Sequence, residues 1–254
     1  MKRIKDLDEI KSIELDILKY IHNICEENHL IYFMAGGTLL GAVRHKGFIP
    51  WDDDIDLLMF REDYEKMIRI INEDNSIYHM ESLESDKGYI STFAKVTDTR
   101  TKIIFAHKMN AETTGVFVDI FPMDGVGNNY KKGAGYVNFL SRCYQTFTSY
   151  RMSMKNTKFS RFFLNKYARL LEFAAKRKAC KSYRYIARVV NMRGECEIMK
   201  CKWFEKRIML DFEGEKFYAP KGYDHYLRRL YGNYMQLPPS TQQRLVHSYN
   251  AYWK

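Results

Sequence analysis

Acidic residues crowd the segment Trp51-Asp52-Asp53-Asp54-Ile55-Asp56, directly before an apolar run. From Asp54 onward polar and apolar residues alternate, which predicts a strand whose side chains two positions apart share one face. Asp54 and Asp56 should then point together, with Asp53 facing away and Asp52 on their face only if the strand begins early. Converging carboxylates are the ligands that a hard divalent cation such as Mg²⁺ prefers. A solvated acidic turn is the alternative, which the apolar run that follows argues against.

A further aspartate, Asp119, interrupts the apolar residues 116–121. An isolated carboxylate in such a strand is costly to bury unless a cation or a donor lies beside it. On a strand next to that of Asp54 and Asp56, it would allow two cations to be clamped. A structural aspartate satisfied by N–H groups or an arginine is the alternative. We therefore predict these three aspartates as the catalytic and metal-binding set, with Mg²⁺ as the ion and Mn²⁺ as its substitute.

A pair of glycines ends the short apolar run at residues 30–34. Because Gly36 and Gly37 lack a Cβ atom, their backbone can approach a phosphate closely. A helix that begins near Thr38 would present free N–H groups to the same anion. We predict that Gly36, Gly37 and Thr38 bind phosphate. Gly37 precedes Asp54 by only 17 residues, which places both parts in one site.

The elements that must hold these residues follow from hydrophobic periodicity. Spacing of three and four predicts helices, alternation predicts strands, and their mixture predicts an α+β fold with a β-sheet core flanked by helices. The expected helices cover residues 6–28, 38–44, 61–72, much of 136–190, and 223–231. The expected strands cover residues 30–34, 54–60, 77–81, 90–96, 102–106 and 115–121, the last stopped by Pro122, and a hairpin joins 207–212 to 215–218.

The bulk composition limits the class of protein. With 254 residues and 46% hydrophobic content the chain can bury a sizeable core. Its N-terminus turns acidic before any apolar run, which argues against a secretory signal, and no apolar stretch reaches the length of a membrane span. Cysteines are few and odd in number, as expected of reduced thiols. We expect a cytoplasmic protein, with the inner face of the membrane as a further location.

Positive charge is concentrated in residues 151–207, which hold 17 Lys and Arg against four Asp and Glu. The whole chain carries +10, so the remainder is slightly acidic. Apolar residues spaced by three and four predict basic amphipathic helices here. A solvated helical face and a peripheral contact with an anionic membrane both stay open. Nucleic-acid binding is disfavoured, because no known module accompanies the charge.

Residues 36–56 resemble, nearly residue for residue, the signature of the LicD family, a branch of the nucleotidyltransferase-fold superfamily. Residues 116–125 are similar to the second motif of that family, and residues 212–239 to its C-terminal pattern. The resemblance implies a nucleotidyltransferase-like catalytic core at residues 1–128. The basic helical segment at residues 129–206 would be an insertion, and the hairpin and helix of residues 207–254 would pack back on the core.

The resemblance also implies an activity, the transfer of phosphocholine or a related phospho-alcohol. The donor would be CDP-linked and the acceptor a hydroxyl of a lipid-linked or cell-surface glycan. Asp52 would be a further metal ligand. Arg44 would contact phosphate, Trp51 would enclose choline or stack on a base, and Lys95 would reach phosphate from its strand. A surface salt bridge is the structural alternative for Arg44, and packing under the loop is that for Trp51.

Two other functions are weighed against this one. Nucleotidyl transfer from an NTP to a sugar or another small acceptor would use the same acidic site. A non-catalytic membrane- or nucleic-acid-binding protein would use the basic segment alone. Such a protein would be expected to have lost Asp54, Asp56 or Asp119, and all three are present.

Overall fold

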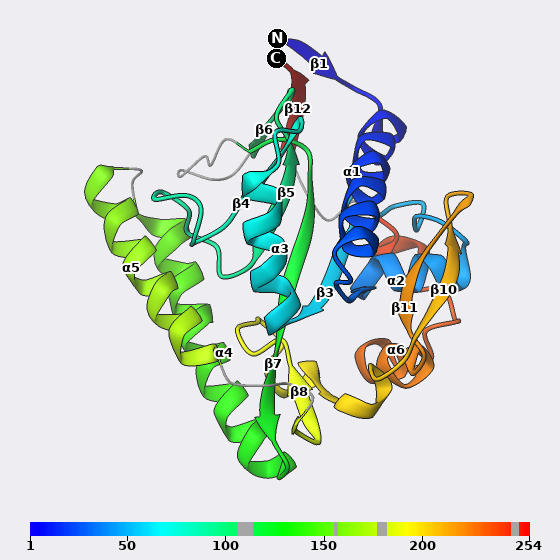
Figure 1. Cartoon of the computed structure of the whole chain (residues 1–254), viewed down its shortest axis with the longest axis vertical. Coiled ribbons are helices and arrows are strands. Elements are labelled where there is room, and N and C mark those ends of the chain that lie inside the picture. The colour runs from blue at the N-terminus through cyan, green and yellow to red at the C-terminus, as the bar shows by residue number, and fades with distance from the viewer. Residues whose placement is uncertain (106–113, 155–156, 177–181, 245–248) are drawn as a thin grey trace.

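The central sheet of the protein is mixed and runs in the order β2-β3-β7-β5-β4 (Figure 1). The computed structural model describes residues 1–105, 114–154, 157–176, 182–244 and 249–254. Within the sheet β3 and β7 are parallel, whereas the other neighbours are antiparallel. The strands are β2 (Tyr32–Met34), β3 (Asp56–Phe60), β4 (Tyr78–Glu81), β5 (Ala94–Asp98) and β7 (Phe117–Gly127). With helices around this sheet, the α+β fold is confirmed.

The longest strand, β7, continues through Pro122, so the predicted stop at this residue is wrong. On one edge β7 pairs with β5 as far as Ile120 and then with β8 (Tyr185–Ala187) from Asp124 onward. Pro122 therefore falls where this edge changes partner, and the missing N–H of proline disrupts no ladder there. β9 (Ile198–Lys200) extends the sheet beyond β8.

Helices α1 (Leu7–Glu27) and α3 (Arg61–Glu73) pack against the central sheet, close to their predicted bounds. The start of α1 is capped by Asp6, whose carboxylate accepts the N–H of Asp8. Helix α2 (Gly36–Arg44) begins earlier than expected, because both glycines belong to its first turn and Ala35 is its N-cap.

Helices α4 (Tyr130–Ser153) and α5 (Lys158–Ala175) lie on the opposite side of the molecule from α1 (Figure 1). A second hydrophobic cluster packs between them, separate from the main core around the sheet. The helical pattern expected up to residue 190 is wrong at its end, where β8 joins the sheet. Residues 129–206 thus include strands as well as the two basic helices.

The C-terminal part follows its prediction closely, with β10 (Arg207–Phe212), β11 (Glu215–Pro220) and α6 (Tyr223–Tyr231). β11 contacts β2, so the hairpin lies against the core. A small sheet of β1 (Lys2–Ile4), β12 (Tyr249–Trp253) and β6 (Thr101–Phe105) brings the two termini together (Figure 1). The strand expected at residues 102–106 is β6, and Ala106 lies outside the described residues. Short 3₁₀ helices cover Gly194–Glu197, Cys201–Trp203 and Ser240–Gln242.

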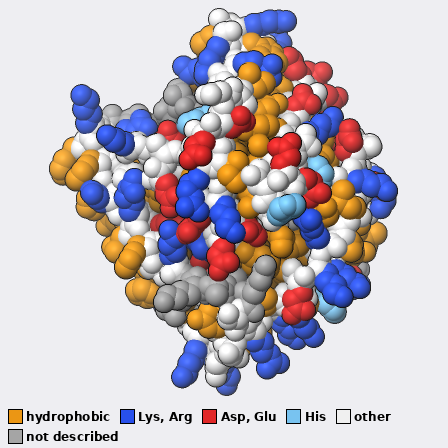
Figure 2. All heavy atoms as spheres, in the orientation of Figure 1, with side chains coloured by type: hydrophobic (Ala, Val, Ile, Leu, Met, Phe, Trp, Pro, Cys, Tyr) orange, Lys and Arg blue, Asp and Glu red, His pale blue; other side chains and the backbone are white. Residues whose placement is uncertain are grey.

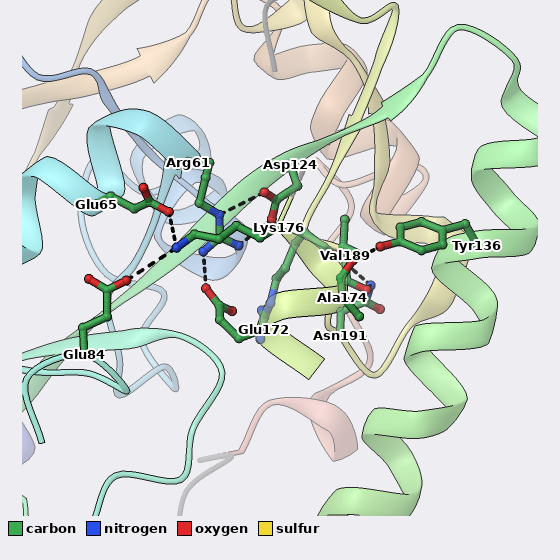
Figure 3. Close-up of polar contacts among 11 residues, drawn as sticks. Arg61, Glu65, Glu84, Asp124, Tyr136, Glu172, Ala174, Lys176, Val189 and Asn191 are labelled. Atoms are coloured by element: carbon green, nitrogen blue, oxygen red, sulfur yellow. Dashed lines mark hydrogen bonds and ion pairs between the residues drawn. The ribbon is translucent and has the colours of Figure 1, made fainter. Parts of the chain in front are cut away.

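An ionic network ties α3, β7 and α5 together (Figure 3). The buried guanidinium of Arg61 donates to both carboxylate oxygens of Asp124, at 2.9 and 2.6 Å, and forms an ion pair with Glu172. Beside it the Lys176 ammonium lies 2.7 Å from a Glu65 oxygen. The network anchors α5 to the sheet. Within the described ranges, no helix combines the length and hydropathy that crossing a membrane requires.

Candidate active site

Three charged residues form a row across the middle of the central sheet. Asp56 on β3 is the register partner of Asp119 on β7, and Asp119 is the register partner of Lys95 on β5. The Lys95 ammonium forms an ion pair with Asp119 and lies 3.3 Å from the centroid of the Phe117 ring. Asp119 and Lys95 are both buried. The positive charge expected beside Asp119 is therefore supplied by Lys95, as in the structural alternative of an aspartate paired with a basic side chain. Metal binding by Asp119 and the phosphate contact of Lys95 stay predictions.

The carboxylates of Asp52, Asp53 and Asp54 gather at the start of β3. One oxygen of each lies within 4.8 Å of the other two. Because β3 begins only at Asp56, the alternation argued for Asp54 does not apply. Asp53, expected to face away, instead contributes an oxygen to this group and is buried. The loop conformation before the strand, rather than strand geometry, brings the three together.

Asp56 lies within the electrostatic field of the neighbouring acids. Burial raises the pKa of its carboxyl well above the usual range, and the charges of Asp54 and Asp119 raise it further. The Arg188 guanidinium lowers this pKa and lies 3.4 Å from the centroid of the Phe121 ring. Arg188 follows β8 and is a functional candidate that the sequence analysis missed. Only its basic charge marked it, among many other basic residues of the same segment.

Glu14 is a second candidate that the sequence analysis missed. It is the acidic residue among the buried positions of α1, only 2% exposed, and its Oε2 atom has no hydrogen-bond partner in the part of the chain that the structure describes. Burial raises the pKa of Glu14 well above the usual range, followed by the charges of Asp54, Asp53, Asp119 and Asp52. The helix therefore directs a further carboxylate toward these four aspartates. A charged residue at an apolar-face position of the helix was the available signal.

The aspartates at positions 52, 53, 54, 56 and 119, together with Glu14, are called the acidic group, and their donor chemistry fits a hard divalent cation. All of its candidate ligands are carboxylate oxygens, which Mg²⁺ and Mn²⁺ prefer. Burial and the neighbouring carboxylates raise the pKa values of Asp56 and Glu14, so the negative charge of their ionised forms is disfavoured, and the Glu14 Oε2 atom has no hydrogen-bond partner among the described residues. An added cation would neutralise that charge and provide the missing partner.

The two glycines allow the helix start and the acidic group to approach each other. A Cβ atom on Gly37 would lie 2.3 Å from an Asp52 oxygen, and one on Gly36 would lie 2.9 Å from an Asp56 oxygen. Gly36 also has a φ of +51°, which glycine adopts without strain. The predicted phosphate contact of both glycines stays a prediction, while their close approach to carboxylates is an additional role.

Thr38 positions the start of β3. Its buried hydroxyl oxygen accepts the N–H of Asp56 at 2.8 Å. The N–H of Gly36 donates to the hydroxyl of Tyr226 at 3.2 Å, which fixes the start of α2 against α6. Both contacts hold backbone next to the acidic group, and the phosphate contact predicted for Thr38 stays a prediction.

Arg44 lies at the other end of α2, about 12 Å from Gly36 at the usual helical rise. Its guanidinium donates to the carbonyl oxygen of Tyr234 at 2.9 Å, in the C-terminal segment. Trp51 is partly buried against the core, with its ring edge-on to that of His45. The packing of Trp51 matches its structural alternative, whereas Arg44 bonds to a backbone carbonyl in place of the expected salt bridge. Contact of Arg44 or Trp51 with substrate stays a prediction.

The hairpin braces the loop between α2 and the aspartates. At its turn the Glu213 carboxylate accepts the N–H of Phe48 at 2.9 Å, and the Glu213 N–H donates to the carbonyl of Lys46. A Cβ atom on Gly47 would lie 2.1 Å from a Glu213 oxygen. The first and the C-terminal motifs of the sequence are thus in direct contact.

Paired aspartates on central strands of a mixed sheet, beside a helix that begins with two glycines, are the arrangement expected of a nucleotidyltransferase-type transferase. The family described as the LicD/FKTN/FKRP nucleotidyltransferase domain matches residues 29–165. The chain is 34% identical to the lipopolysaccharide cholinephosphotransferase LicD of Haemophilus influenzae, over 99% of both chains. It is also 44% identical to the human ribitol 5-phosphate transferase FKRP over 45 residues, 18% of this chain and 9% of that protein. The chain belongs to the LicD family and is a LicD-type transferase.

Proposed function

We propose that the protein transfers phosphocholine, or a related phospho-alcohol, from a CDP-linked donor to a hydroxyl of a cell-surface glycan. The observation that carries the proposal is the similarity to a lipopolysaccharide cholinephosphotransferase over the full chain. The register pairing of Asp56 with Asp119 supports it, because phosphotransfer needs charge neutralisation at a fixed point. By analogy with that relative, a lipopolysaccharide hydroxyl is the first acceptor to test.

The proposed cofactor is Mg²⁺, as one or two ions, with Mn²⁺ as its substitute. Asp52, Asp54, Asp56 and Asp119 would hold the ions, and the orphaned oxygen of Glu14 lies in their neighbourhood. When bound, the ions would neutralise negative charge on the diphosphate of the donor and on the phosphate of the departing CMP.

The residues of the chain would divide the remaining tasks. The acceptor oxygen forms a bond to the transferred phosphorus, the P–O bond to CMP breaks, and CMP leaves with the electron pair. A carboxylate of the acidic group accepts the proton of the acceptor hydroxyl. Lys95 holds Asp119 in place through their ion pair. Arg188, which influences the pKa of Asp56, and the N–H groups of Gly37 and Thr38 in the first turn of α2 would bind phosphate oxygens.

The experiment that tests the proposal is a donor panel with product analysis. The protein is incubated with Mg²⁺ and CDP-choline, CDP-ethanolamine, CDP-glycerol, CDP-ribitol or an NTP, in the presence of a lipopolysaccharide acceptor. Release of CMP from a CDP-alcohol, stopped by EDTA and restored by Mg²⁺, is the expected result. Release of pyrophosphate from an NTP would replace the proposal with nucleotidyl transfer.

The proposal places the protein in the cytoplasm, at the inner face of the membrane, where a lipid-linked acceptor would be encountered. A peripheral contact through residues 151–207 would hold it there, because this segment carries 17 basic residues against four acidic ones. Fractionation of cells that express the protein would test this location. Recovery of the protein entirely in the soluble fraction at low salt would contradict it.

A further inference from the structure

Helix α5 has apolar residues on both of its faces. Its inner face is buried, with Leu164, Ala168, Leu171 and Ala175 in the second hydrophobic cluster. Its outer face carries five large apolar side chains that are 49% to 78% exposed, Phe159, Phe162, Phe163, Leu170 and Phe173. A helix that only covered a core would be polar on this side. The outer face therefore requires a second explanation.

The charges on the outer face are all of one sign. The remaining exposed residues of α5 are Lys158, Lys166 and Arg169, so the helix exposes five large apolar and three basic residues and no acidic one, and of these the Arg169 guanidinium donates to the carbonyl of Leu83. Glu172, the single acidic residue of the helix, is turned inward to its ion pair with Arg61. Lys166 places its ammonium 5.5 Å from the centroid of the Phe162 ring, so basic and aromatic groups intermix.

The outer face is also at the edge of the molecule. In Figure 1 α5 is the outermost helix on its side, and Figure 2 shows apolar side chains mixed with basic ones along the same edge. Exposed apolar area of this extent marks an interaction site rather than ordinary surface. A single convex helix offers no pocket, which suits a deformable partner better than a rigid one.

We propose that the outer face of α5 inserts into an anionic lipid surface. The phenylalanine and leucine side chains would enter the headgroup and acyl boundary, and the basic residues would contact anionic headgroups. A second copy of the chain fits less well, because symmetric pairing of two such faces would bring Lys158, Lys166 and Arg169 against like charges. The inference rests on the membrane contact of the proposed function and names the surface that makes it. Vesicle binding and transfer are measured separately, so either can fail without the other.

The test uses the full chain in flotation with vesicles of phosphatidylcholine, pure or mixed equally with phosphatidylglycerol. We expect flotation with the anionic vesicles, weakened by added salt, and much less with the neutral ones. The variant carrying Phe159→Ser, Phe163→Ser and Phe173→Ser should lose at least about tenfold in partitioning, since each change removes an apolar anchor. The variant carrying Lys158→Gln and Lys166→Gln should weaken binding to anionic vesicles alone.

The matched control exchanges exposed apolar residues elsewhere, Met235→Ser with Leu237→Ser. It should float as the wild type does, and circular dichroism should show every variant folded, because all exchanged positions are exposed. Failure to float with anionic vesicles, or equal flotation of the triple phenylalanine variant, would overturn the inference. A concentration-dependent dimer in sedimentation velocity, lost in that variant, would assign the face to a second copy instead. If the wild-type protein did not transfer phosphocholine from CDP-choline in vitro, the proposed function would be contradicted, while the flotation result would still stand.

Discussion

Asp56 and Asp119 are register partners on the parallel neighbours β3 and β7, although they lie far apart in the sequence. Adjacent strands are about 4.8 Å apart, so the two carboxylates emerge side by side from the sheet. On the other side of Asp119, Lys95 compensates one of the two charges. Burial raises the pKa of Asp56, the charges of Asp54 and Asp119 raise it further, and the Arg188 guanidinium lowers it.

Replacing Lys95 by methionine should destabilise the protein and make its stability more dependent on Mg²⁺. Asp119 would lose its ion-pair partner in a buried setting, at a cost of about 3 to 5 kcal/mol. A cation bound at the acidic group would replace part of the missing charge, so Mg²⁺ should raise the melting temperature of Lys95→Met more than that of the wild type. Thermal unfolding with EDTA and with Mg²⁺ measures both effects. Equal Mg²⁺ shifts would argue against a cation next to Asp119.

Replacing Glu14 by glutamine should stabilise the metal-free protein and weaken its response to Mg²⁺. The exchange keeps the shape of the side chain but removes a buried charge that four aspartates repel, a gain of about 1 to 3 kcal/mol. Because the folded-state pKa of Glu14 is raised, the fold favours its protonated form. The stability of the wild type in EDTA should therefore rise as the pH falls through that pKa toward 4.5, and less so in Glu14→Gln.

Chemical unfolding in EDTA and calorimetric titration with Mg²⁺ test the Glu14 prediction without any activity assay. An unchanged Mg²⁺ affinity would show that Glu14 does not face the cation. A less stable metal-free variant would show that its carboxylate has a partner that compensates it.

Replacing Arg61 by methionine should destabilise the fold without altering Mg²⁺ binding. The exchange leaves Asp124 and Glu172 buried without their cation, at a cost of about 3 to 5 kcal/mol. Urea unfolding gives the free energy, and the control Arg228→Met removes an exposed pair with Asp224 and should change it little. Comparable losses in both variants would contradict the role of the buried network.

Replacing Thr38 by valine should lower the transfer activity while the protein stays folded. The isosteric change leaves the N–H of Asp56 without its acceptor and costs about 1 to 3 kcal/mol. Asp56 would then be held less firmly at the start of β3, and kcat should fall while KM for the donor changes little. Thr38→Ser, which keeps the hydroxyl, should recover most of the activity. Equal activity of the valine and serine variants would show that the hydrogen bond has no role.

Sequence patterns were sufficient where one element determines its own structure. The apolar face of α1, the hairpin around Glu213 and the helix α6 lie where periodicity and turn residues indicate. They were insufficient where partners distant in sequence decide the outcome. β7 continues through Pro122 because β8 takes over from β5, and the small sheet at the termini needs three segments from separate parts of the chain.

The same distinction between local and distant determinants applies to the residues of the candidate active site. Asp56 and Asp119 can be identified locally, since each is an acid among apolar residues, and the structure brings them together. Asp53 was misjudged because the loop before β3 does not alternate as a strand would. Glu14 and Arg188 were missed because only the tertiary fold brings a helix position and a residue after β8 close to these aspartates.

The most direct test of the account is Mg²⁺-dependent release of CMP from CDP-choline by Asp56→Asn and Asp119→Asn, measured beside the control Asp211→Asn. Asp211 is an exposed aspartate on β10, where its register partner is Lys216 on β11. We expect both site variants to stay folded and to lose activity by at least about a hundredfold, while Asp211→Asn keeps the activity of the wild type. Full CMP release by a folded Asp56→Asn or Asp119→Asn variant would contradict the assignment of the paired aspartates as the active site.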